Sequence, residues 1–320
     1  MIARRALLGA ALAAPAAAQA QAAWPQYPVR ILVGFPPGGL TDVLSRVIAP
    51  VLAARLGQPF IVENRPGASG IIVAEAVAKA SDAHTLMMGH PTALAIAPAF
   101  AQRLPYDAET AFAPISLLAL QPHLLLVKAD ARWPDLAAML AEGRARPGAL
   151  TYASSGVGSV QHIQAEQLCA AAGMQAVHVP YRGSAPTMTD LASGQIDFVI
   201  DGVGISRPML EGGRLRALAT AADHRLPGMA ALPTLAESGV RGVLPGSWFG
   251  LVAPAAMPAA QQAALHAACL AALPTPEVVR ALANASAEAV GSTPAEFRGF
   301  IAGQKASLRE LAKTARISME

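Results

Sequence analysis

The sequence predicts an α/β fold with mainly parallel sheets flanked by helices. Short apolar runs typical of strands alternate with longer stretches of helical pattern, and such alternation is typical of βαβ units. A glycine-rich turn between a strand and a helix also occurs once in each half of the chain. We expect strands at residues 29–35, 60–63, 85–89, 124–127, 151–154, 177–181, 198–201, 215–220 and 249–253. We expect helices at residues 42–56, 69–79, 133–144, 162–172 and 185–193.

The two glycine-rich turns are residues 31–42 (ILVGFPPGGLTD) and residues 151–162 (TYASSGVGSVQH). Glycine lets a backbone turn tightly and approach a ligand closely. The helix start after each turn presents unpaired N–H groups and the positive end of the helix dipole, which favour an anion. Ligands of open α/β sheets bind beyond the carboxyl ends of strands, where both turns fall. The pair predicts a cleft whose opposite walls hold the two ends of a small anion.

Residues 1–20 have the pattern of a signal peptide that directs export to the periplasm. Arg4 and Arg5 form the basic start, residues 6–18 an apolar core, and Ala18-Gln-Ala20 a small-residue cleavage site. This core is shorter than the roughly 20 apolar residues of a membrane span. The two arginines fit either the general secretory route or the twin-arginine route.

Charge and cysteine content narrow the class of protein. The formal net charge is +3, two units of which belong to Arg4 and Arg5, and a nucleic-acid-binding surface would show clustered Lys and Arg instead. Cys169 and Cys269 fall on helices of different predicted domains, which favours two separate buried thiols, with a disulfide in an oxidising compartment as the alternative.

The exported chain, about 300 residues, is long enough for two domains. Residues 112–121 are expected to cross from the first domain to the second, and residues 244–250 to return. The helices of residues 258–314 would then pack on the first domain. We therefore expect domain 1 at residues 24–120 and 250–320, and domain 2 at residues 121–249.

Ten stretches, in the same order along almost the whole exported chain, carry a family resemblance. They are residues 27–42 (YPVRILVGFPPGGLTD), 62–68 (VENRPGA), 104–106 (LPY), 112–115 (FAPI), 152–159 (YASSGVGS) with His162, 180–183 (PYRG), 191–197 (LASGQID), 213–219 (GRLRALA), 232–239 (LPTLAESG) and 248–250 (WFG). In these the chain resembles the periplasmic solute receptors of tripartite tricarboxylate transporters, the Bug receptors.

The resemblance implies a periplasmic-binding-protein-like clamshell of two domains that closes on a small carboxylate in the interdomain cleft. It implies an organic acid or amino acid as ligand, delivery to the membrane permease subunits of a transporter, a monomer, and no chemistry. Two positions depart from the family pattern. Ser69 stands where the family commonly has Gly, and His90 stands near a position that is commonly Ser or Thr; they add a hydroxyl and a titratable group near the expected cleft.

Candidate binding residues on the first domain centre on the first turn, whose backbone N–H groups would receive one carboxylate. They are Phe35, Gly38, Gly39, Leu40, Thr41, Asp42, Ser69, His90 and Thr92. Asp42 has two interpretations. It would serve a ligand amine or a water, or it would only complement the helix dipole and pair with Arg46 four residues on.

Candidate binding residues on the second domain centre on the second turn. They are Ser154, Ser155, Gly156, Gly158, Ser159, His162, Tyr181 and Asp201. Ser159 fits a helix N-cap, a role compatible with an anion site. His162 is as consistent with helix packing as with ligand contact, and Asp201 would serve a ligand amine or a water, or cap the following segment.

Enzymatic interpretations have little support in the sequence. Residues 156–160 (GVGSV) lack the Gly-x-Ser-x-Gly order of a nucleophile elbow and the third glycine of a dinucleotide fingerprint. The histidines and cysteines show no metal-ligand spacing. We therefore expect a binding protein with no metal and no cofactor. A receptor that presents its ligand to a sensor kinase is the alternative, and a periplasmic hydrolase a remote one.

Overall fold

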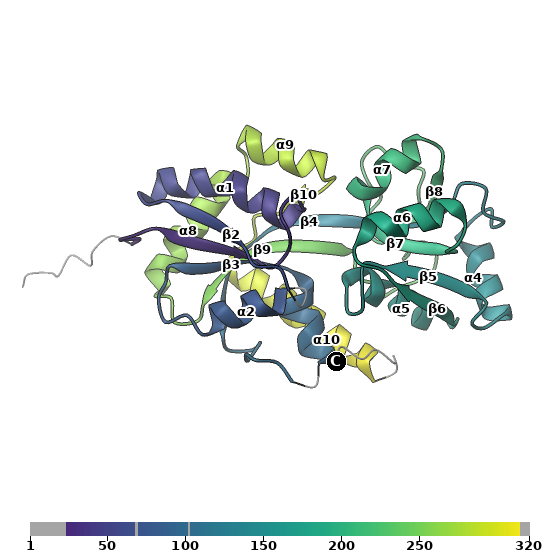
Figure 1. The fold of residues 1–320 in the computed structure, drawn as a ribbon, viewed down its shortest axis with the longest axis horizontal. Coiled ribbons are helices and arrows are strands. Elements are labelled where there is room, and N and C mark those ends of the chain that lie inside the picture. Colours follow the sequence, from purple (N-terminus) through teal and green to yellow (C-terminus); the bar gives the residue numbers. More distant parts are fainter. Residues whose placement is uncertain (1–23, 68–69, 102, 314–320) are drawn as a thin grey trace, which may run out of the picture.

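The computed structural model describes residues 24–67, 70–101 and 103–313. Figure 1 shows two lobes side by side, linked by strands that run from one into the other. The first lobe holds β1–β3, α1–α3 and α8–α10, and the second holds α4–α7 and β5–β8. The predicted signal peptide, residues 1–20, and Ser69 lie outside the described residues.

The sheet of the first lobe has the strand order β2-β1-β3-β9-β4. β1 pairs in parallel with β2 and β3, whereas β9 runs antiparallel to both β3 and β4, and the short β10 pairs antiparallel with β4. These strands are β1 (Val29–Val33), β2 (Phe60–Asn64), β3 (Thr85–Gly89), β4 (Phe112–Lys128), β9 (Gly246–Pro254) and β10 (Glu288–Ala289).

The sheet of the second lobe continues from the far half of β4. That half pairs antiparallel with β7 and with β8, and β5 pairs in parallel with β6 and β7. The strands are β5 (Leu150–Ser154), β6 (Ala176–Pro180), β7 (Phe198–Gly202) and β8 (Leu215–Thr220). A single strand of 17 residues, β4, therefore belongs to both sheets.

Helices cover both faces of each sheet, so each lobe has two apolar cores. In the first lobe α1, α8 and α9 pack on one face, and α2 and α10 on the other; in the second lobe α4 and α5 oppose α6 and α7. The helices are α1 (Leu40–Leu56), α2 (Ile71–Ala78), a π-helical turn (Thr92–Ile96), α3 (Ala97–Phe100), α4 (Leu136–Ala145), α5 (Val160–Ala172), α6 (Ser184–Ser193), α7 (Val203–Glu211), α8 (Ala259–Ala272), α9 (Pro276–Asn284) and α10 (Pro294–Ala312).

The α/β class and the helix-flanked sheets are confirmed, but the sheets are mixed rather than mainly parallel, because β4 and β9 form antiparallel ladders that the sequence did not predict. Both segments expected as connections belong to β4 and β9, which pair with each other where they pass between the lobes, with Gln121 opposite Ser247. At this crossing a Cβ on Gly246 would lie 2.0 Å from the carbonyl oxygen of Gln121, so only glycine lets the strands approach. The predicted domain limits thus fall within continuous strands.

Two further observations concern the described residues. Cys169 on α5 and Cys269 on α8 are both buried and unpaired, as the favoured interpretation expected. Among the helices of the described ranges, none combines the length and apolarity needed to cross a membrane.

Candidate ligand-binding cleft

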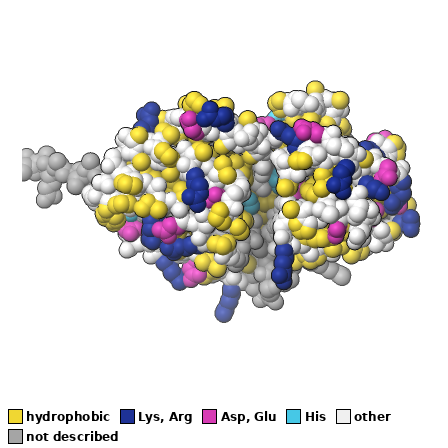
Figure 2. Space-filling model, turned by 45° about the horizontal axis from the view of Figure 1, so that its top comes forward, with side chains coloured by type: hydrophobic (Ala, Val, Ile, Leu, Met, Phe, Trp, Pro, Cys, Tyr) yellow, Lys and Arg dark blue, Asp and Glu magenta, His cyan; other side chains and the backbone are white. Residues whose placement is uncertain are grey.

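A cleft of about 560 Å³ lies between the two lobes, and Figure 2 shows the surface hollowed there. The first lobe contributes Gly34, Phe35, Pro36, Pro37, Gly39, Leu40, Thr41, Pro66, Gly67, His90 and Thr92. The connecting strands contribute Gln121, Ser247 and Phe249, and the second lobe contributes Ser155, Gly156, Ser159, Val160, Gln161, Gly183 and Ser184. No Asp, Glu, Lys or Arg is among these lining residues.

The first glycine turn leads from β1 into α1 along the first-lobe wall. Gly39 is the N-cap of α1, and it has no side chain to cap the helix. The N–H groups of Leu40 and Thr41, whose residues line the cleft, find no acceptor in the described part of the chain, as expected for the first turn of a helix. Gly34 allows this turn to pack closely against Gly70, because a Cβ at position 34 would lie 2.4 Å from the Cα of Gly70.

Asp42 holds the first turn together. Its buried carboxylate accepts hydrogen bonds from Arg46 Nε at 2.9 Å, the Gly38 N–H at 3.0 Å and Asn64 Nδ2 at 2.9 Å. Burial acts to raise the pKa of Asp42, but these hydrogen bonds outweigh it and lower the pKa below its usual range. With its oxygens already engaged, Asp42 fits the structural interpretation.

The second glycine turn leads from β5 into α5 along the opposite wall. The Ser159 hydroxyl accepts the N–H of His162 at 3.3 Å and so caps α5 as predicted. The Gly158 N–H donates to His162 Nδ1 at 3.1 Å. The His162 ring is buried and stacks on His178 with centroids 3.9 Å apart. Burial, with a smaller effect of His178, lowers the pKa of His162 to about 4.

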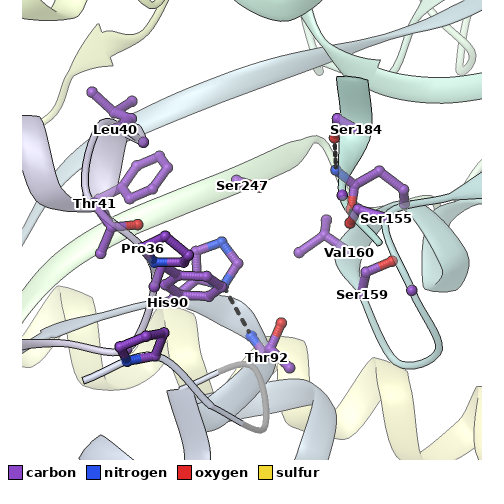
Figure 3. Close-up of a pocket in the computed structure, with 18 of the residues that line it drawn as sticks. Pro36, Leu40, Thr41, His90, Thr92, Ser155, Ser159, Val160, Ser184 and Ser247 are labelled. Carbon is purple, nitrogen blue, oxygen red and sulfur yellow. Dashed lines mark hydrogen bonds between the residues drawn. The ribbon is translucent and has the colours of Figure 1, made fainter. Parts of the chain in front are cut away.

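Gln161 presents a fixed amide to the cleft. Its Nε2 donates to Asp201 Oδ1 at 3.0 Å and to Ser184 Oγ at 3.3 Å, and its Oε1 accepts from Ser155 Oγ at 2.9 Å. Figure 3 shows Ser155, Ser159 and Ser184 together on this side. Asp201 lies buried behind Gln161 and also accepts its neighbour's N–H, from Gly202, at 2.7 Å. The second-lobe wall is therefore neutral and rich in hydroxyl groups.

The first-lobe wall is apolar around His90, opposite the hydroxyl groups in Figure 3. The His90 ring meets Phe35 edge-on, with centroids 4.8 Å apart, and Phe249 at 5.7 Å. Burial, with a smaller effect of His123, lowers the pKa of His90 to about 3. The ring is thus neutral at physiological pH.

Of the predicted site residues that the structure describes, nine line the cleft and seven do not. Those in the lining are Phe35, Gly39, Leu40, Thr41, His90, Thr92, Ser155, Gly156 and Ser159. Those outside the lining are Gly38, Asp42, Ser154, Gly158, His162, Tyr181 and Asp201. Ser154 bonds His178 Nε2 at 2.7 Å, and the Tyr181 hydroxyl donates to Asp190 at 2.5 Å, so both serve the second lobe internally.

Several polar lining residues were missed by the sequence analysis, chiefly Gln121, Gln161, Ser184 and Ser247. Ser184 had a local signal, because it begins a helix directly after the 180–183 motif, the same strand–glycine–helix order as the two turns. Gln121 and Ser247 had none, since they reach the cleft only through the pairing of β4 with β9. Across the described residues, no cluster of three or more His, Cys, Asp or Glu has the arrangement of a metal site.

Comparisons with known proteins agree on a family. The model of the tripartite tricarboxylate transporter family receptor matches residues 44–316. The structure of R. palustris Rpa4515 with adipate is similar, at TM-score 0.79 and 35% identity over 92% of this chain and 99% of that one. The structure of MatC (Rpa3494) from Rhodopseudomonas palustris with bound malate has a TM-score of 0.78 and 31% identity, over 90% of this chain and 100% of that one. The structure of the periplasmic binding protein BugD has a TM-score of 0.77 and 28% identity, over 92% of this chain and 99% of that one.

Proposed function

Because the chain belongs to the tripartite tricarboxylate transporter receptor family of periplasmic solute-binding proteins, we propose that it captures a small carboxylate-containing metabolite between its lobes and hands it to a transporter of this type. The ligand is an organic acid or an amino acid. The protein acts in the periplasm as a monomer, after export through its first 20 residues, and the permease subunits of the transporter are its partners.

One observation carries the proposal. The start of α1 has no side-chain cap, and the residues that bear its free N–H groups, Leu40 and Thr41, line the cleft. Such a helix start favours an anion through both its N–H donors and its dipole. Two similar structures hold the dicarboxylates adipate and malate, which supports a carboxylate as the anion.

The second lobe supplies the other end of the site. Its hydroxyl groups at Ser155, Ser159 and Ser184 would bond the distal part of the ligand when the lobes close around β4 and β9. Each hydrogen bond to a charged group contributes about 1.5–3 kcal/mol. Four to six of them, less the cost of closure, are compatible with the roughly 8 kcal/mol of a micromolar complex.

The experiment is a thermal-shift screen of mono-, di- and tricarboxylates and amino acids, followed by calorimetry on the acids that bind. At 100 times its dissociation constant a ligand adds about 2.7 kcal/mol of stability. Each binding acid is then compared with its methyl ester, which keeps the shape and removes the charge. We expect the ester to lose at least tenfold in affinity. Equal affinity of acid and ester, or no carboxylate bound at all, would refute the proposal.

A further inference from the structure

His90 occupies a ring-lined part of the cleft that the carboxylate anchor does not use. It follows β3 directly, and its ring lies against those of Phe35 and Phe249. All three residues line the cleft, as does Pro36. A ligand held by its carboxylate at the start of α1 would place its body against this group of rings.

One hydrogen bond of His90 favours Nε2 as the ring nitrogen that carries the proton. Nδ1 accepts the backbone N–H of Thr92 at 3.5 Å, and burial keeps the ring neutral, with a pKa of about 3. A neutral imidazole whose Nδ1 is an acceptor carries its proton on Nε2. Among the described residues the hydrogen bond of the His90 ring is made by Nδ1, and His90 lines the cleft, so Nε2 is an N–H donor left for a ligand.

One neutral donor between aromatic rings suits a particular kind of acceptor. An uncharged carbonyl, hydroxyl or ether oxygen is satisfied by a single N–H. A second carboxylate would lose its water there and find no cation, because no Lys or Arg is among the described residues that line the cleft, and an unpaired buried charge is costly. The rings themselves favour an apolar, cyclic ligand body.

We propose that His90 makes the cleft selective for monocarboxylates whose cyclic or apolar body carries an uncharged acceptor oxygen, in preference to aliphatic dicarboxylates. The inference rests on the proposed function, since it assumes that a carboxylate binds at the start of α1. It sets this chain apart from the similar structures that hold adipate and malate.

The test uses four probes that differ in one feature at a time. Cyclohexanecarboxylate has a ring and one carboxylate, and 4-oxocyclohexanecarboxylate adds an uncharged acceptor oxygen to it. In trans-cyclohexane-1,4-dicarboxylate a second carboxylate takes the place of that oxygen. Adipate has two carboxylates, like the cyclic diacid, but no ring. Calorimetry on the whole protein should rank the oxo acid first. We expect it to bind about tenfold more tightly than the unsubstituted acid, which corresponds to about 1.4 kcal/mol, and more tightly than either dicarboxylate.

Two variants then assign the preference to His90. His90→Phe keeps a ring and removes the donor, so the ratio of the two affinities, oxo acid over cyclohexanecarboxylate, should fall from about ten to about one, whatever the affinity for cyclohexanecarboxylate itself becomes. His90→Gln keeps an N–H donor and should retain part of the preference. Should His90→Phe fail to fold, the imidazole ¹⁵N spectrum of the unmodified protein decides instead, by showing whether Nε2 carries the proton at pH 7.

The outcomes separate the two proposals. A dicarboxylate that binds as tightly as the oxo acid, an oxo preference unchanged in His90→Phe, or a proton on Nδ1 would overturn the role of His90 and leave carboxylate binding intact. If none of the four probes and no acid of the wider screen binds, the proposed function fails, and this inference fails with it.

Discussion

The two glycine turns share one hydrogen-bonding pattern but differ in the charge of the acceptor side chain and in the capping of the helix that follows. In each, a glycine N–H donates to the side chain four residues on, from Gly38 to Asp42 at 3.0 Å and from Gly158 to His162 at 3.1 Å. The acceptor is an anionic carboxylate in the first turn and a neutral imidazole in the second. The helix after the second turn is capped by Ser159, whereas the helix after the first is not capped by any side chain.

Each turn leaves two cleft-lining helix N–H groups without an acceptor among the described residues, those of Leu40 and Thr41 in the first and those of Val160 and Gln161 in the second. The second turn adds the hydroxyl groups of Ser155 and Ser159 to the lining, whereas the first offers its N–H groups beside apolar side chains. We therefore assign the carboxylate to the first turn and the distal part of the ligand to the second. The comparison also separates the two glycines, since Gly39 has φ −74° and open space around a Cβ, whereas Gly158 has φ +72° and lies outside the lining.

The largest expected effect is a loss of stability in mild acid that comes from the second turn and not from the first. The pKa of His162 is about 4 in the folded protein and about 6.5 in an unfolded chain, so the unfolded chain takes up the proton first as the pH falls. The stability that His162 contributes is complete above pH 6.5 and is lost towards pH 4, at most about 3 kcal/mol and about 2 kcal/mol by pH 5.

Urea unfolding at pH 7 and pH 5 measures this loss. His162→Gln keeps a neutral acceptor at both pH values. Between pH 7 and pH 5 its free energy of unfolding should therefore fall by about 2 kcal/mol less than that of the parent. Asp42→Asn is the matched control. The pKa of Asp42 lies below its usual range, so the stability that Asp42 contributes is lost only in stronger acid, and this variant should lose as much as the parent. Identical losses in the parent and His162→Gln would contradict the prediction.

Gly158→Val should affect folding rather than binding. A branched residue at φ +72° costs of order 1–3 kcal/mol, which thermal or urea unfolding would record. Asn tolerates this backbone region better, so Gly158→Asn should be closer to the parent. If Gly158→Val melts like the parent and yet binds tenfold more weakly, the second turn approaches the ligand directly and the comparison fails.

Gly39→Val should affect binding rather than folding. The backbone at Gly39 suits any residue, and its Cβ would point into open space, so the variant should fold, with a loss of at most about 1 kcal/mol because valine is a poorer N-cap than glycine. The valine side chain would obstruct the approach to the N–H groups of Leu40 and Thr41. We expect at least a tenfold loss of affinity for the best acid of the screen, or about 1.4 kcal/mol, with Gly39→Ala intermediate. Parent-like affinity in a folded Gly39→Val would place the carboxylate elsewhere.

Ser159→Ala has the smallest expected effect. The hydroxyl caps α5 through the N–H of His162, and loss of such a cap costs about 1 kcal/mol of stability. Binding of the same acid should weaken by less than in Gly39→Val, because the second wall keeps Ser155 and Ser184. Calorimetry and urea unfolding on the two variants test this order directly, and a greater loss of affinity in Ser159→Ala would reverse the assignment of the two walls.

The sequence predicted the two turns because their signals are local. Glycine spacing, the preceding apolar run and the following helical pattern are all read within about 12 residues. The orientation of side chains was not predicted, since Asp42 and His162 fold back onto their own turns and only the three-dimensional structure shows this. The long strand β4 was divided into a connection and a short strand, because Pro114 and Pro122 interrupt its apolar pattern. Its pairing with β9, which brings Gln121 and Ser247 to the cleft, depends on residues more than 100 positions apart.

A crystal structure of the protein with the tightest-binding acid of the screen tests the central claim most directly. We predict a carboxylate oxygen within 2.7–3.2 Å of the backbone N–H groups of Leu40 and Thr41, and the second lobe's hydroxyl groups on the distal part of the ligand. A carboxylate bound instead at the start of α5, with the start of α1 in contact only with the ligand body or with water, would contradict the account.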